Sequence, residues 1–121
     1  MKRRFAVTGA IAAGLLILST GNAWAGTNIT VKTTDSTPGG GATFQANGDR
    51  VVVCDLQEDG LPAVGYLRRY DGALWSTTVA GGYNTCKERS IDIPEGQKVT
   101  LTVCLIKDGN DVFCRTAAGA A

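Results

Sequence analysis

Four cysteines and a group of carboxylates are the residues of this chain that could do chemistry. The 121-residue sequence has four cysteines, 11 Asp and Glu residues and no histidine. Without histidine, a Ser-His-Asp or Cys-His arrangement is impossible, and so is a histidine-bearing metal site. The chemistry left for an enzyme is a carboxylate pair, as in glycoside hydrolysis. Carboxylates are also the side chains that bind calcium.

The acidic candidates gather in the segment Asp55-Leu56-Gln57-Glu58-Asp59-Gly60. Acidic residues at its first and fifth positions and glycine at its sixth make Asp55 and Asp59 calcium candidates. Position twelve of such a loop needs a bidentate glutamate, but it is Tyr66 here. A hydrolase would also need a substrate cleft, which so small a domain hardly encloses. We therefore interpret the segment as a glycine turn whose Asp side chains bond to nearby backbone, and we expect no metal and no cofactor.

A strand pattern lies beside the last two cysteines. Apolar residues alternate with other residues over 98–105, the period of a half-buried strand. With a three-residue turn at 108–110, Leu105 faces Phe113 and Cys104 lies directly opposite Cys114, close enough for a disulfide. This pairing leaves Cys54 to bond with Cys86. A zinc site is disfavoured, because the chain has no Cys-x-x-Cys pair and no histidine.

Residues 1–25 have the three parts of a secretory signal peptide. Basic residues at 2–4 come first, a largely apolar stretch covers 5–18, and Ala23-Trp24-Ala25 is a small-x-small cleavage site. The apolar stretch is too short and too interrupted by glycine to span a bilayer comfortably. We expect cleavage after Ala25 and an extracellular protein, the environment in which disulfides persist.

Residues 26–121 have the size of one domain. Removing 25 of the 121 residues leaves 96, and three of the 12 Lys and Arg go with them. The remaining segment has nine basic and 11 acidic residues, which gives a net charge of −2. This near-neutral, slightly negative charge lacks the excess of basic residues that binding to nucleic acid or to an anionic membrane requires. We therefore expect neither as a partner, and keep an extracellular protein or polysaccharide as the candidate.

The domain reads as short strands separated by turns. The dipeptides Asn47-Gly48 and Asp71-Gly72 are typical of tight hairpin turns. No stretch beyond the leader has a convincing helical period. The pattern predicts an all-β fold, an antiparallel two-sheet sandwich of about seven to eight short strands with two disulfides. We expect an immunoglobulin-like Greek key, with a small barrel as the alternative. The expected strands cover residues 28–33, 42–46, 50–55, 63–70, 73–80, 89–93 and the two arms of 98–114.

The hairpin around Asp71-Gly72 holds the candidate binding residues. With a two-residue turn, Arg68 faces Trp75 and Tyr66 faces Thr77. Tyr, Trp and Arg are enriched at binding hot spots, and Arg68 could stack on Trp75. The alternative is that Tyr66 and Trp75 face the core together with Val64 and Val79. The candidate binding set is Tyr66, Arg68, Arg69, Tyr70 and Trp75.

Two resemblances come from these residues. The motifs that carry the first are Asn47-Gly48-Asp49, Val53-Cys54-Asp55, Asp59-Gly60, Val64-Gly65-Tyr66-Leu67 and the ending from Val103-Cys104 to Cys114. They resemble a largely uncharacterised family of small secreted proteins from actinomycetes such as Streptomyces, which implies fold and compartment. More distantly, the chain is similar to the tendamistat-type α-amylase inhibitors, which present Trp-Arg-Tyr at a turn. Here Arg68 stands where that tryptophan should be, before Arg69-Tyr70, and the cysteine spacing differs.

These observations together predict a secreted, disulfide-bonded β-domain that is not an enzyme and acts by binding. We expect an extracellular binding or inhibitor module that uses the hairpin residues. A structural or cell-envelope protein without a discrete site is the alternative, and a small hydrolase comes third.

Mass mapping of the secreted protein tests the sequence analysis directly. We expect an N-terminus at Gly26, no free sulfhydryl, and peptides joined as Cys54 with Cys86 and Cys104 with Cys114. A free thiol, a bound metal or a bond between Cys54 and Cys114 would contradict this architecture.

Overall fold

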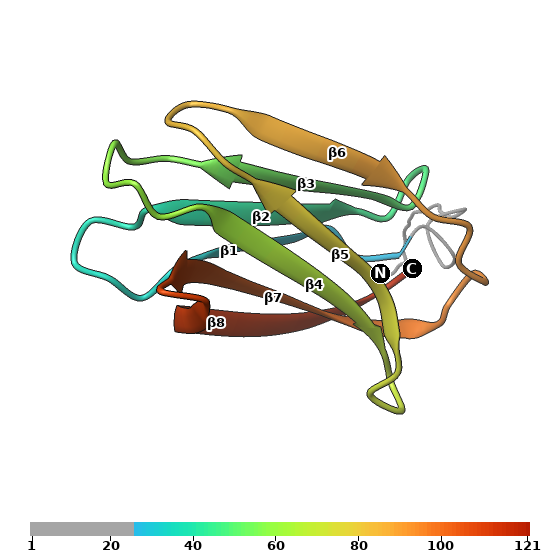
Figure 1. Ribbon diagram of the computed structural model, residues 1–121. Helices are drawn as coiled ribbons and strands as arrows, with labels where there is room; N and C mark the ends of the chain where they lie inside the picture. Colours follow the sequence, from blue (N-terminus) through green and yellow to red (C-terminus); the bar gives the residue numbers. More distant parts are fainter. Residues whose placement is uncertain (1–25) are drawn as a thin grey trace, which may run out of the picture.

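Two antiparallel four-stranded sheets pack face to face in the computed structural model, which describes residues 26–121 (Figure 1). In sheet order, the first contains β1 (Ile29–Lys32), β2 (Gly40–Gln45), β3 (Arg50–Asp55) and β6 (Cys86–Ser90). The second contains β5 (Leu74–Ala80), β4 (Ala63–Arg69), β7 (Lys98–Lys107) and β8 (Asn110–Ala120). The predicted two-sheet antiparallel sandwich is confirmed.

The predicted leader, residues 1–25, lies outside the described part of the chain. Within residues 26–121, no helix is long and apolar enough to cross a membrane.

The chain crosses between the sheets several times. Strands β1, β2 and β3 follow one another in the first sheet, and β4 and β5 form a hairpin in the second. Strand β6 then returns to pair with β3, and β7 returns to pair with β4. The orders β2-β3-β6 and β4-β7-β8 correspond to A-B-E and C-F-G of an immunoglobulin domain. The chain differs at three sheet edges. In the first sheet β1 is added beyond β2 and β6 is an edge strand, and in the second sheet β5 is added beside β4.

The core lies between the two sheets and consists of alternate residues from each strand. Phe44, Val51 and Val53 of the first sheet are fully buried, as is Leu67 of β4. Strand β7 buries every apolar residue of the predicted alternation, namely Val99, Leu101, Val103 and Leu105. This confirms the period-two interpretation of β7, the central strand that pairs with both β4 and β8.

The β7–β8 hairpin has the predicted disulfide but a different register. Its turn is the two residues Asp108 and Gly109, with φ angles of 53° and 78°, as in a type I′ turn. Leu105 therefore faces Val112, and the predicted pairing of Leu105 with Phe113 is wrong. A bulge follows at Phe113, whose φ is 54°. Because the bulge adds one residue to β8, it compensates for the shorter turn.

Both predicted disulfides are present. Cys104 bonds with Cys114 across the bulge, and Cys54 bonds with Cys86, its direct neighbour in the β3–β6 pairing. No free cysteine is found among the described residues. Each bond joins neighbouring strands of one sheet, so neither disulfide connects the two sheets.

The two sheets lie close together at Gly65 of β4. A Cβ atom at this position would lie 2.5 Å from Cγ2 of Val53 in the opposite sheet. Such a distance is far inside van der Waals contact, so only glycine fits opposite Val53 without movement of the backbone or side chain.

Replacement of Gly65 by alanine tests this contact. We expect G65A to lower the free energy of unfolding by about 1–3 kcal/mol through overpacking against Val53. The double variant with V53A should lose less than the sum of the two single losses, because the smaller side chain makes room. Denaturant unfolding measures all three values. The control G81A, whose nearest contact is 4.0 Å away, should change by under about 0.5 kcal/mol. Strict additivity would contradict the contact.

Candidate functional site

The candidate site lies at the turn end of the β4–β5 hairpin, where a bulge changes the expected pairing. Leu67 pairs with Ser76, but the next residue, Arg68, pairs with Leu74, so Trp75 is an extra residue in β5. The prediction that Arg68 faces Trp75 is therefore wrong. Its guanidinium lies over the ring of Tyr66, 5.1 Å from the ring centre.

Arg69 takes the place expected for Arg68. Its guanidinium lies 5.8 Å from the ring centre of Trp75. Its Nη2 atom also forms an ion pair of 3.2 Å with Oδ2 of Asp71. The Asp71 side chain in turn accepts a 3.0 Å hydrogen bond from the amide of Ala73 through Oδ1. An arginine held by a ring face on one side and a carboxylate on another has a restricted orientation.

The turn itself is wider than the sequence predicts. The amide of Arg69 donates to the carbonyl of Ala73 at 2.8 Å, and the amide of Gly72 donates to the carbonyl of Arg69 at 3.0 Å. Gly72 has a φ of 88°, a conformation that favours glycine. Tyr70 lies in this loop with 67% of its surface exposed. It is the most accessible of the five candidate residues.

The alternation of β4 settles which residues face the core. Leu67 is fully buried, whereas Val79 is 45% exposed and Leu74 is 51% exposed. The alternative in which these hairpin residues face the core is therefore wrong for Tyr66 and Val79, whereas Val64 is buried at 1% exposure. Tyr66 lies on the outer face of the second sheet, and Trp75, half-buried, packs against the edge of the core.

Tyr66 forms a hydrogen bond that the sequence analysis missed. Its hydroxyl donates to Oδ2 of Asp111 at 2.6 Å, joining β4 to β8 across β7. This hydrogen bond is the main reason why the pKa of Tyr66 lies above its usual value of 10.0, with burial and the negative charge of Asp111 adding to it. Arg68 opposes the rise. The predicted register placed Asp111 opposite Lys107, so it gave no sign of this contact.

In the acidic segment 55–60, the Asp carboxylates accept hydrogen bonds from backbone amides. Asp55 is 3% exposed, and it accepts from Gln57 N at 3.4 Å and from Gly82 N at 3.1 Å. Asp59 accepts from Leu61 N at 2.9 Å. This supports the interpretation as a turn with local hydrogen bonds. Within the described residues, no three His, Cys, Asp or Glu side chains are grouped to hold a metal ion.

No protein-family profile matches the chain, and no curated protein matches it. Among solved structures, it is similar to an endonuclease/exonuclease/phosphatase from Beutenbergia cavernae DSM 12333. The TM-score is 0.59 and the sequence identity is 26%. The match covers 76% of this chain and 26% of that chain, so this chain spans about a quarter of its neighbour's length.

This similarity contradicts the functional prediction. The sequence analysis concluded that the protein is not an enzyme but a binding or inhibitor module, or else a structural protein. The match to an enzyme overturns that conclusion. The reasoning failed because a missing histidine excludes particular catalytic arrangements within one chain, whereas a β-sandwich can be part of proteins with many activities.

The hydrogen bond between Tyr66 and Asp111 gives a pH-dependent test. Because the pKa of Tyr66 is raised in the folded protein, the neutral hydroxyl stabilises the fold. This stabilisation is complete below about pH 10, the pKa of an unfolded tyrosine, and it is lost as the pH rises through the pKa of Tyr66 in the folded protein. Absorbance titration of the phenolate should show one tyrosine with a pKa above the usual value of 10.0, and Y66F should remove this titration. In D111N, that titration should move down toward the usual value. Identical titration curves for D111N and the parent would contradict the contact.

Proposed function

We propose that this chain takes part in phosphoester hydrolysis, with the arginines of the β4–β5 hairpin engaging the phosphate group of the substrate. Its similarity to an endonuclease/exonuclease/phosphatase is the observation that carries the proposal. The matched part of this chain has the size of a domain, and it corresponds to about a quarter of the neighbour. The shared unit is therefore a β-sandwich rather than a whole enzyme of that length.

The geometry of Arg68 suits a phosphate ester. A guanidinium that lies over an aromatic ring uses its face for the ring and keeps its N–H donors at its edge. Those donors match two phosphate oxygens at once. Arg68 is half-buried, and Tyr66 beneath it is tied to Asp111, which limits the movement of the pair.

Arg69 adds a second guanidinium beside the first. Its ion pair with Asp71 is about 40% exposed on both sides, so a phosphate oxygen could replace the carboxylate without uncovering a buried charge. We assign the larger share of phosphate binding to Arg68, because Arg69 must first give up a partner.

We also propose that the protein is exported after removal of residues 1–25 and belongs to the secreted actinomycete family that its motifs resemble. Two disulfides among the described residues support an oxidising compartment. Covalent stabilisation suits a domain of this size, because it buries only a modest core.

Ester binding and hydrolysis by the purified protein test the proposal. We expect saturable binding of p-nitrophenyl phosphate in calorimetry, and any hydrolysis of this ester or of bis-p-nitrophenyl phosphate with Mg²⁺ to depend on the same arginine. R68K keeps the charge but loses the planar donor pair, so it should weaken binding by about threefold to tenfold.

R89A is the matched control, because Arg89 is an exposed arginine on β6 in the other sheet. It should bind the ester like the parent. A protein that neither binds nor hydrolyses either ester, or an R68K variant that behaves like R89A, would overturn the proposal.

A further inference from the structure

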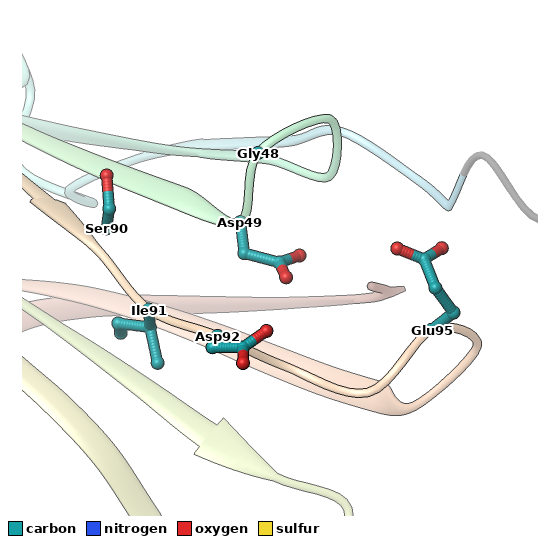
Figure 2. Close-up of a pocket in the computed structure, with 6 residues that line it drawn as sticks. All are labelled: Gly48, Asp49, Ser90, Ile91, Asp92 and Glu95. Carbon is teal, nitrogen blue, oxygen red and sulfur yellow. The ribbon is translucent and has the colours of Figure 1, made fainter.

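An open acidic pocket lies at the end of the sandwich where the β2–β3 loop meets the connection from β6 to β7 (Figure 2). Its volume is about 410 Å³. Figure 2 shows the Asp49 carboxylate directed toward the side of the pocket where the Glu95 carboxylate lies, with the Asp92 carboxylate below that of Asp49. The remaining lining residues are Gly48, Ser90 and Ile91.

Asp49 is a buried residue of this pocket whose position is held by hydrogen bonds. It has a φ of 50° and is only 9% exposed. Its carbonyl accepts from Ile91 N at 2.9 Å, and its Oδ2 atom accepts from Ile93 N at 3.1 Å. Both contacts hold the connection that carries Asp92 and Glu95. The position of Asp49 is therefore set by the fold and not by a ligand.

The second carboxylate oxygen of Asp49 has no partner. Its Oδ1 atom is buried and accepts no hydrogen bond from the described residues. A buried acceptor without a donor is costly, and the cost is greater when the group is charged. A donor that reached this atom from the pocket would remove that cost, and beside two further carboxylates a positively charged donor is favoured.

No basic side chain of the described chain lines the pocket. Two arginines are adjacent in sequence to its lining residues. The Arg50 guanidinium bonds with Gln45 and pairs with Glu88 at 3.5 Å, and Arg89 is exposed on β6. Asp92 and Glu95 are both exposed and belong to neither ion pair of the described residues. Their charges therefore remain available to a ligand.

We propose that this pocket binds an organic cation through a guanidinium or alkylammonium group. Calcium needs oxygen ligands that surround it at about 2.3–2.6 Å. Among the described residues, no three His, Cys, Asp or Glu side chains form a group that could hold a metal ion. A guanidinium spreads five N–H donors over a plane and accepts nothing, which matches a pocket of separated acceptors.

The proposal concerns a site at the opposite end of β3 from the acidic segment, and it does not depend on phosphoester hydrolysis. The cation would come either from a free amine or from a basic side chain of a peptide. Both present the same donors to Asp49, Asp92 and Glu95.

Titration of the mature protein with agmatine, spermidine and the peptide Gly-Arg-Gly-amide distinguishes these sources. We expect saturable binding of at least one of them that weakens with added salt, and shifts of the Ile91 and Ile93 amide signals in NMR. Tighter binding of the free amines indicates a small-molecule ligand, and tighter binding of the peptide indicates a protein side chain.

The variants D92N and E95Q remove charge from exposed positions that hold no hydrogen bond of the fold. Each should weaken binding by about twofold to fivefold, and the two together by about tenfold. E58Q, an exposed acid outside the pocket, is the matched control and should bind like the parent. D49N is avoided as the main test because Asp49 holds Ile91 and Ile93 in place.

Absence of binding by all three cations would overturn the proposal. So would binding that D92N and E95Q leave unchanged, or binding of Ca²⁺ at these residues without binding of any organic cation.

Discussion

The packing of β4 and β7 against the first sheet is the constraint on which the other features depend. Gly65 lies against Val53, and Leu67 and Leu101 fill the space between the sheets. Because side chains alternate along a strand, these inward residues force Tyr66 and Arg68 onto the outer face. The disulfides stabilise strand pairs within each sheet but do not join the sheets. The core therefore decides which side chains a ligand can reach.

Two bulges then adjust the outer face. The one at Phe113 lets a two-residue turn coexist with the Cys104–Cys114 bond, and that turn places Asp111, the partner of Tyr66, opposite Ile106. The one beyond Leu67 brings Trp75 under Arg69. In both places, one extra residue redirects side chains that a regular ladder would have placed elsewhere. The pair of Arg69 with Trp75 forms for this reason, whereas Arg68 and Tyr66 meet because they are two residues apart on one face of β4.

The candidate sites occupy different parts of one scaffold and have opposite charge. The hairpin of β4 and β5 presents two guanidinium groups, whereas the pocket beside Asp49 presents three carboxylates. The similarity to an endonuclease/exonuclease/phosphatase bears on the domain as a whole. It changes how the hairpin is interpreted, because arginines that could bind a protein partner can also bind a phosphate ester.

The sequence by itself determined the sandwich, most of its strands and both disulfide pairings, because alternation and turn dipeptides are local signals. It also identified the residues of the hairpin. Only the tertiary structure decided that Arg69 and not Arg68 stacks on Trp75, that Asp111 holds Tyr66, and that Asp49 keeps an unpartnered oxygen beside Asp92 and Glu95. These contacts depend on bulges and on segments far apart in the chain, and neither follows from local periodicity.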